Sequence, residues 1–332
     1  MRIVLATACL LAFPLALPAQ ALCVDGPFSR VYSFGDSLSD NGNQFSMSWY
    51  PPDPYWEGRF SNGPVWVEQL AAVLRLEEDG LKNFATGGAT TTTVHTAQVQ
   101  PLVVASGGQL PGDALYLYWA GANDLLTLLS NPTGNPFFIV LNAMNQTSAA
   151  LNSLAGAGAR NIVVANLPDF SKIPRVKALN DPTLIPAIQT LVEFYNGRLA
   201  STIALVESQT GLDIIEVDTY SLVQNIHADP RRYAITNVEE SVLLPGGGLR
   251  RGAEGYLYFD DIHPTFSGHR IVMLSVFAAL GLSVEMDSSR DGFDVQDPRG
   301  PWGWRSLAYA DINCDGRVDW RDQSVLLQMF SR

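Results

Sequence analysis

The sequence predicts a three-layer α/β/α sandwich built on a mainly parallel sheet. Short, strongly apolar runs of strand length alternate along the chain with longer segments whose apolar residues recur at helical spacing, as repeated βαβ units require. Most of the short runs end in glycine, asparagine or aspartate, which are residues that form turns. With 332 residues, 47% of them hydrophobic, the chain is long enough for one large α/β domain and a small appendage.

The expected strands share an apolar run that stops at turn residues, and they cover residues 31–34, 81–89, 113–120, 161–166 and 212–217. The run at 113–120 reads Asp-Ala-Leu-Tyr-Leu-Tyr-Trp-Ala, which is typical of a strand buried on both faces of a parallel sheet. Apolar residues at helical spacing predict helices over residues 65–76, 137–154, 187–210 and 266–280. Residues 50–64, rich in proline and aromatic residues, and residues 90–109 are interpreted as two loops that border a cleft.

The two ends of the chain are predicted to lie outside this domain. Arg2 precedes an apolar stretch that is too short to cross a bilayer, and Pro-Ala-Gln-Ala follows it at residues 18–21. This pattern predicts a signal peptide, residues 1–21, so we expect a secreted protein, extracellular or periplasmic, without stable membrane insertion. The main domain is assigned to residues 22–285, a linker to 286–307 and a separate small segment to 308–332.

Charge and cysteine content limit the partners of the chain. The formal net charge is -12 and no cluster of lysine and arginine occurs, so nucleic acid and anionic membrane surfaces are not expected as partners. Of the three cysteines, Cys9 belongs to the predicted signal peptide. Cys23 and Cys314 remain, and in an oxidising compartment they could form a disulfide or stay as two free thiols.

A serine lies on the turn that follows the first predicted strand. The sequence Val-Tyr-Ser-Phe-Gly-Asp-Ser at residues 31–37 is a short apolar run that ends in a turn bearing Ser37. Open parallel sheets bind ligands at the carboxyl ends of their strands, so the Ser37 hydroxyl is well placed to face a cleft. The alternative is that Ser37 caps the next helix.

A base for this serine is suggested by one of the four histidines. A serine hydroxyl is a weak nucleophile and needs a base, which in turn needs a group that fixes its tautomer. His263 follows Asp260 by three residues, a separation at which the carboxylate can fold back to accept the Nδ1 proton. Asp261 is the rival for this role. His95, His227 and His269 are interpreted as surface or hydrogen-bonded structural histidines, because no metal-ligand spacing accompanies them.

Donors for the oxyanion of an acyl-transfer reaction are also suggested at strand ends. Gly88 and Asn123 follow two further predicted strands, where a backbone amide and a side-chain amide could meet the developing charge. Gly87 is then expected to form the turn. Asp36, Asp124, Asp40 and Asn43 are interpreted as stabilising these turns.

Four short motifs in this order give the chain a clear resemblance to the GDSL, or SGNH, hydrolases. The motifs are Gly35-Asp36-Ser37-Leu38, the block from Asn83 to Gly88, Gly121-Ala122-Asn123-Asp124, and Asp260 with His263, and they extend over most of residues 28–282. The resemblance implies that Ser37, His263 and Asp260 form a catalytic triad. It also implies an oxyanion hole made of the Ser37 and Gly88 amides and the Asn123 side chain.

The resemblance therefore predicts a secreted serine hydrolase that cleaves carboxylic esters, lipid-like esters among them, through an acyl-enzyme on Ser37. No cofactor is needed for such catalysis. Residues 58–63 and 166–168 are similar to a branch that includes secreted lipases, choline-ester hydrolases and acyltransferase-like enzymes. Two alternatives remain open: an acyltransferase using the same acyl-enzyme, and a catalytically silent binding protein on the same fold. Arg59 and Asn62 are candidates either for lining the substrate cleft or for a structural role.

The last segment contains the pattern of a calcium-binding loop. Oxygen-bearing residues recur at loop positions one, three, five, nine and twelve, with a glycine at six and a backbone carbonyl at seven. The expected ligands are Asp311, Asn313, Asp315, the Arg317 carbonyl, Asp319 and Asp322. The segment resembles half of a dockerin, so one structural Ca²⁺ is expected and a protein partner through this loop is doubtful. The alternative is a solvated acidic turn.

Overall fold

The computed structural model describes residues 28–74, 76, 79–130, 134–251, 255–286 and 293–296. The predicted signal peptide, Cys23 and Cys314, and the calcium loop at 311–322 all lie outside these ranges. The expectations attached to them therefore stay predictions. Within the described residues, no helix is both long and apolar enough to cross a membrane.

Five parallel strands form the central sheet in the order β2-β1-β3-β4-β5. Their bounds are β1 Val31–Gly35, β2 Leu81–Asn83, β3 Leu115–Trp119, β4 Asn161–Ala165 and β5 Ile215–Val217. The predicted α/β fold class is confirmed. Because all five strands run in one direction, the turns after them meet at the same edge of the sheet.

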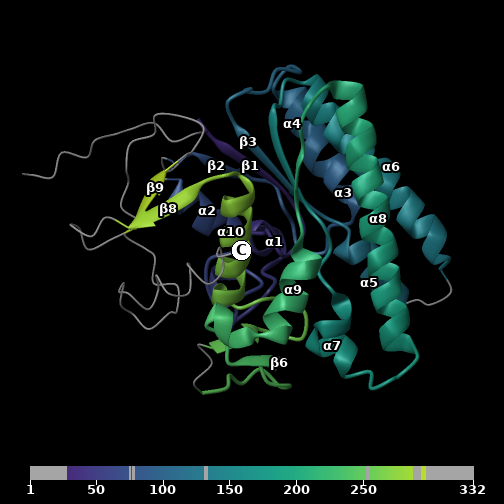
Figure 1. Cartoon of the computed structure of the whole chain (residues 1–332), viewed down its shortest axis with the longest axis vertical. Coiled ribbons are helices and arrows are strands. Elements are labelled where there is room, and N and C mark those ends of the chain that lie inside the picture. Colours follow the sequence, from purple (N-terminus) through teal and green to yellow (C-terminus); the bar gives the residue numbers. More distant parts are fainter. Residues whose placement is uncertain are drawn as a thin grey trace, which may run out of the picture.

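Helices cover both faces of the sheet, as Figure 1 shows. On one face lie α2 (Trp66–Val73) and α10 (Phe266–Ala279), and on the other lie α6 (Pro136–Gly156) and α8 (Leu184–Thr210). Successive side chains of a strand point to opposite faces, so each strand contributes to two cores. On β3, Tyr116 and Tyr118 join the core beneath α6 and α8, whereas Leu115, Leu117 and Trp119 join the core beneath α2 and α10.

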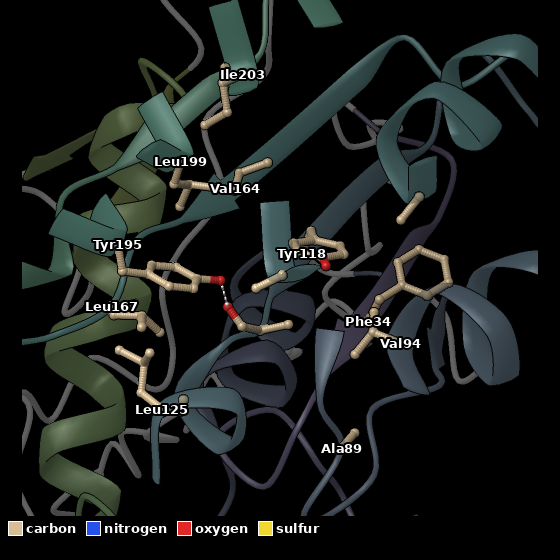
Figure 2. Close-up of a cluster of buried hydrophobic side chains, with 14 of the residues drawn as sticks. Phe34, Ala89, Val94, Tyr118, Leu125, Val164, Leu167, Tyr195, Leu199 and Ile203 are labelled. Atoms are coloured by element: carbon tan, nitrogen blue, oxygen red, sulfur yellow. Dashed lines mark hydrogen bonds between the residues drawn. The ribbon is translucent and has the colours of Figure 1, made fainter. Parts of the chain in front are cut away.

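Figure 2 shows part of the larger core, where helix α8 meets the ends of the strands. Tyr195 is fully buried there, and its hydroxyl donates a hydrogen bond of 3.2 Å to the carbonyl oxygen of Ala120. Leu125 of α5 (Ala122–Ser130) and Leu167, which follows β4, pack into the same cluster. The hydrogen bond from Tyr195 to Ala120 holds the segment after β3, which carries the candidate site residue Asn123.

The prediction of a loop over residues 90–109 is wrong. The chain is helical from α3 (Thr91–Thr93) through a π-helical stretch, η2 (Val94–Val99), into α4 (Gln100–Ala105). Thr90 caps this helix, and the carboxylate of Asp124 accepts hydrogen bonds from the amide and hydroxyl of Thr91. A run of four threonines has little helical propensity of its own. The hydrogen bonds from Thr91 to the distant carboxylate of Asp124 therefore stabilise the start of the helix.

The remaining elements are short and lie mainly between the larger ones. They are α1 Asn43–Ser48, η1 Trp56–Gly58, η3 Phe170–Lys172, α7 Pro174–Lys177, α9 Thr219–Ala228, η4 Pro230–Tyr233, β6 Asn237–Ser241, β7 Tyr256–Tyr258, β8 Ser283–Met286 and β9 Phe293–Gln296. Strands β8 and β9 pair antiparallel; β8 spans the boundary predicted at residue 285, and β9 lies beyond it.

Candidate active site

The turn that bears Ser37 is held by contacts from two other parts of the sheet edge. A Cβ atom at Gly35, the last residue of β1, would collide with the carbonyl oxygen of Trp119, so the close approach of β1 to β3 requires glycine here. The buried side chain of Gln98, in the π-helical stretch, accepts from the Gly35 amide at 2.9 Å and donates to the Gly35 carbonyl at 2.8 Å. Gln98 therefore satisfies both backbone polar groups of Gly35, which lies beyond the last residue of β1 that pairs with β2.

Two aspartates shape the turn around the serine, as expected. Asp36 Oδ1 accepts from the amide of Leu38, and the carboxylate of Asp40 accepts from the amides of Gly42, Asn43, Gln44 and Gly87. The bond from Gly87 joins the serine turn to the turn after β2. Asn43 adds to this junction by donating to the carbonyl oxygens of Asn83 and Ala85.

Ser37, His263 and Asp260 lie in one hydrogen-bonded chain. The Oγ atom of Ser37 is 2.7 Å from His263 Nε2, and His263 Nδ1 is 2.7 Å from Asp260 Oδ2. A carboxylate can only accept, so Nδ1 donates to Asp260, and in the neutral form of the ring Nε2 presents its lone pair to the serine hydroxyl. The structure thus brings together the three residues that the sequence analysis grouped, and their catalytic role stays a prediction.

The carboxylate of Asp260 stays ionised despite its burial. Burial alone raises its pKa, but the charge of His263 and hydrogen bonds from His263 and Tyr55 outweigh this effect and lower the pKa to about 2. Its Oδ1 atom accepts from the amides of Ile262 and His263, at 2.8 and 2.6 Å. The segment 260–263 is thereby wound into one tight turn around its own carboxylate.

Asp261, the rival for the histidine, points elsewhere. Its carboxylate oxygens accept from Arg175 Nε and Nη2, each at 2.9 Å, and its carbonyl oxygen accepts from the Arg175 amide. This two-point pairing differs from the solvated or backbone-binding role expected for Asp261. It also fixes α7 against the histidine turn.

Gly88 and Asn123 line the same cavity as Ser37 and His263. Gly88 has a φ of 78° and open space where a Cβ would be, so the turn after β2 places its positive φ at Gly88 and not at Gly87. Gly87 is required for another reason: a Cβ there would lie 2.5 Å from the ring of Phe60. Within the described part of the chain, the amides of Ser37 and Gly88 donate no hydrogen bond and remain available.

Asn123 lies in the first turn of α5 instead of the loop that its motif suggested. Its side-chain amide donates to the carbonyl oxygen of Ala89 at 3.0 Å, which fixes the orientation of the amide, and among the described residues its second N–H group has no acceptor. The adjacent Asp124 acts structurally, as expected, through its bonds to Thr91.

A cavity of about 590 Å³ opens beside Ser37. Tyr50 and Phe60 line it, which confirms the expected contribution of the loop at 50–64, whereas residues 90–109 contribute Thr90 alone. Sequence reasoning missed the rest of the wall, which is mostly apolar and comes from elements far apart in the chain. Its members include Phe170, Ile173, Leu222, Val223, Ile226 and Leu257.

Arg59 and Asn62 have structural roles and do not line this cavity. Arg59 pairs with Glu68, whose carboxylate also accepts from the amide of Val65 at the start of α2. Asn62 accepts from the amide of Phe266 at the start of α10.

The other three histidines are distinct from the site. His95 is bonded to Gln146 and His227 to Tyr258, as expected of structural histidines. The interpretation of His269 as a surface or hydrogen-bonded residue is wrong. His269 is fully buried, and neither ring nitrogen has a hydrogen-bond partner within the described residues. Burial lowers its pKa to about 3, so the ring is neutral. No group of metal-ligating side chains occurs in the described ranges.

The parallel sandwich, with these four turns gathered at its carboxyl edge, is the layout of an SGNH-type α/β hydrolase fold. The chain belongs to the GDSL-like Lipase/Acylhydrolase family, whose profile matches residues 31–276. At the family level, the chain is therefore a carboxylic-ester hydrolase, and its general reaction is ester hydrolysis or acyl transfer.

Similar proteins carry related names. The chain is 31% identical to the phosphatidylcholine-sterol acyltransferase of Aeromonas hydrophila, over 94% of this chain and 89% of that protein. It is 30% identical to the thermolabile hemolysin of Vibrio parahaemolyticus, over 74% of this chain and 62% of the hemolysin. An acetylesterase of Thermothelomyces thermophilus is 26% identical over 79% of this chain and 90% of its own length. Among solved structures, an acetylxylan esterase of Geobacillus stearothermophilus matches 77% of this chain and 96% of its own at 14% identity and a TM-score of 0.48.

The buried carboxyl group of Asp36 makes the free energy of unfolding depend on pH. Burial raises the pKa of Asp36 to about 7, and its Oδ2 atom has no hydrogen-bond partner in the described part of the chain. The native state therefore holds a proton that the unfolded chain releases near its ordinary value of 3.8, so Asp36 costs stability progressively as the pH rises from about 4 to about 7.

For Asp36→Asn, we expect the free energy of unfolding relative to wild type to increase across this pH range, by at most about 4 kcal/mol, and to level off above it. Urea unfolding at several pH values measures the difference. Asp113→Asn, at an exposed position, is the matched control and should show no such trend. A difference for Asp36→Asn that is constant from pH 4 to pH 8 would contradict the prediction.

Proposed function

We propose that this protein is a secreted serine hydrolase that cleaves carboxylic esters with an apolar acyl group, through an acyl-enzyme on Ser37. The observation that carries the proposal is the pair of 2.7 Å contacts from Ser37 Oγ to His263 and from His263 to Asp260, beside a largely apolar cavity. A buried serine has no structural need for such a relay, which is the arrangement that activates a hydroxyl.

In the proposed reaction, Nε2 of His263 removes the proton of Ser37 as the serine oxygen attacks the ester carbonyl. The resulting imidazolium donates through Nδ1 to Asp260, whose low pKa keeps the carboxylate charged and the ring fixed. The imidazolium then gives its proton to the leaving alcohol. In the second half, His263 takes a proton from a water molecule that attacks the acyl-enzyme, and returns it to Ser37 Oγ as the bond between that oxygen and the acyl group breaks and the free acid leaves.

The oxyanion of the tetrahedral intermediate needs donors that are already oriented. The amides of Ser37 and Gly88 and the free N–H of Asn123 suit this role, because all three residues line the cavity at the serine. Since the Asn123 amide is held by its bond to Ala89, little reorganisation is required during the reaction.

Replacing the nucleophile is expected to cause a large loss of activity. Ser37→Ala should lower kcat for a p-nitrophenyl ester by at least about 10³-fold and leave the melting temperature within a few degrees, because only one hydroxyl is removed. Ser46→Ala, at an exposed position on α1, is the control and should keep full activity. A fluorophosphonate probe should label wild type and not Ser37→Ala. Undiminished turnover by Ser37→Ala would refute the proposal, and absence of labelling and turnover in wild type would favour a silent binding protein.

The size and lining of the cavity favour an acyl chain longer than acetyl. Leu222, Val223 and Ile226 of α9 present apolar side chains to the cavity, so each buried methylene of the substrate contributes about 0.8 kcal/mol. We therefore expect kcat/KM to increase from acetate to octanoate esters, by more than tenfold.

This preference can be tested on α9 itself. Val223→Trp fills part of the cavity and should reduce the octanoate rate more than tenfold while changing the acetate rate little. Asn225→Ala, exposed on the same helix, should leave both rates unchanged. Equal losses for acetate and octanoate in Val223→Trp would exclude this wall as the acyl site.

Acyl transfer is the second candidate function, because the relative at 31% identity is named an acyltransferase. An alcohol would then replace water at the second step, with the same residues in the same roles. Measuring the partition of product between free acid and acylated alcohol, at increasing alcohol concentration, decides between the two functions.

Calcium binding by residues 311–322 is a separate proposal that rests on sequence alone. Chelation should lower the melting temperature of the full chain by several degrees, with recovery on adding Ca²⁺ but not Mg²⁺, while activity at moderate temperature is little changed. Asp311→Ala should abolish the response. A melting temperature that is indifferent to chelation and to added Ca²⁺ would remove the proposal.

A further inference from the structure

We propose that Tyr55 is a positioning residue for the reaction, acting through Asp260 on the orientation and the proton affinity of His263. The inference rests on the proposed function of Ser37, His263 and Asp260. It concerns a residue that no motif singles out, separated from Asp260 by 205 positions in the sequence.

Tyr55 donates its hydroxyl to Asp260 Oδ2 at 2.7 Å. This is the same oxygen atom that accepts from His263 Nδ1, so the tyrosine and the histidine share one acceptor. The other oxygen, Oδ1, already accepts two backbone amides. A carboxylate has about four acceptor positions, and here all four are filled. The carboxylate thus has no alternative rotation that would keep its hydrogen bonds.

The phenol is held where it can act. Its ring packs edge-on against Phe259, with centroids 5.0 Å apart, and against Phe60 at 6.2 Å. The segment that carries Tyr55 is tied to the histidine turn at two further points, by Ser61 donating to the Pro264 carbonyl and by Asn62 accepting from Phe266. Burial and the charge of Asp260 raise the pKa of Tyr55 far above 10, so it remains a donor throughout the working pH range.

Because Tyr55 and His263 share Asp260 Oδ2, the tyrosine weakens the attraction between Asp260 and the protonated ring of His263. A donor on this oxygen withdraws part of the negative charge that would otherwise stabilise the imidazolium. Removing the donor leaves a more basic carboxylate that holds the protonated ring to higher pH, and it also lets the carboxylate turn. The acid limb of the kcat/KM profile should therefore move to higher pH, and kcat should fall because the ring is less well oriented.

Other ionisable groups interact electrostatically with His263. Asp36, which follows β1, and the buried His269 of α10 both do so. The Asp261 and Arg175 pair lies beside the same turn. None of these groups is altered by a change at Tyr55, so a difference between variants reports the tyrosine hydroxyl.

The test compares Tyr55→Phe with wild type and with Tyr116→Phe. Tyr116 likewise donates one hydrogen bond through its hydroxyl, but to the backbone carbonyl of Pro111, and it lies near the start of β3, at the opposite edge of the sheet. For Tyr55→Phe we expect kcat to fall about tenfold with KM within about twofold, and the acid limb to move up by about half a pH unit or more. Tyr116→Phe should keep the wild-type profile. Rates are divided by the concentration of sites that react with a fluorophosphonate probe.

A second variant tests the sign of the effect. Incorporation of 3-fluorotyrosine at position 55 keeps the ring and makes the phenol a stronger donor, so the acid limb should move to lower pH, opposite to Tyr55→Phe. If Tyr55→Phe reduces activity only by reducing the titrated sites, or if both variants leave the profile in place, the inference is wrong. Failure of the proposed function is recognised separately, by wild-type turnover that Ser37→Ala retains.

Discussion

The direction of the strands is the constraint on which the site depends. Ser37, Gly88 and Asn123 follow β1, β2 and β3, which lie side by side, and a parallel arrangement is the one that brings all three turns to the same edge. The histidine turn is not attached to a strand of this sheet. It is held instead by the loop at 50–64 and by α7, through side-chain contacts with Asn62, Ser61 and Arg175.

Three carboxylates near the serine differ in what they contribute because they differ in the donors that reach them. Asp260 accepts four hydrogen bonds, and its pKa is low. Asp40 accepts backbone amides alone, and burial outweighs them and raises its pKa. Asp36 accepts one amide, has no further partner in the described ranges, and has a pKa raised to about 7. Burial is common to all three. Asp40 accepts as many hydrogen bonds as Asp260, so the direct contact of Asp260 with the charge of His263 is what lowers its pKa while that of Asp40 is raised.

Much of this architecture was predictable from the sequence, for reasons visible in particular elements. The strand at 115–119 is apolar on both faces, and no other common structure explains such a short run bounded by turn residues. The motifs around Ser37, Asn123 and His263 are short segments, and in each the residue types within a few positions are enough to suggest a role.

What the sequence could not predict depends on contacts across long separations. The helix that starts at Thr91 is fixed by Asp124, and the end of β1 by Gln98, 63 residues away. The part of the cavity wall on α9 could not be predicted from the local sequence either. Leu222, Val223 and Ile226 lie in a helix of mixed composition, and its apolar side lines the cavity only in the folded protein. Tyr55 had no signal beyond membership of an aromatic-rich loop, since its partner lies 205 residues further on.

The loop at 50–64 both lines the cavity and positions the catalytic carboxylate proposed at Asp260. Tyr50 and Phe60 border the cavity into which substrate enters, and Tyr55, between them in the chain, bonds the carboxylate that fixes the histidine. A change of loop length that widened the entrance would therefore displace the acidic end of the relay as well. Variation of substrate range in this protein is consequently expected to arise on α9, which lines the cavity without bonding to Asp260, and the loop is the part of the wall least free to change.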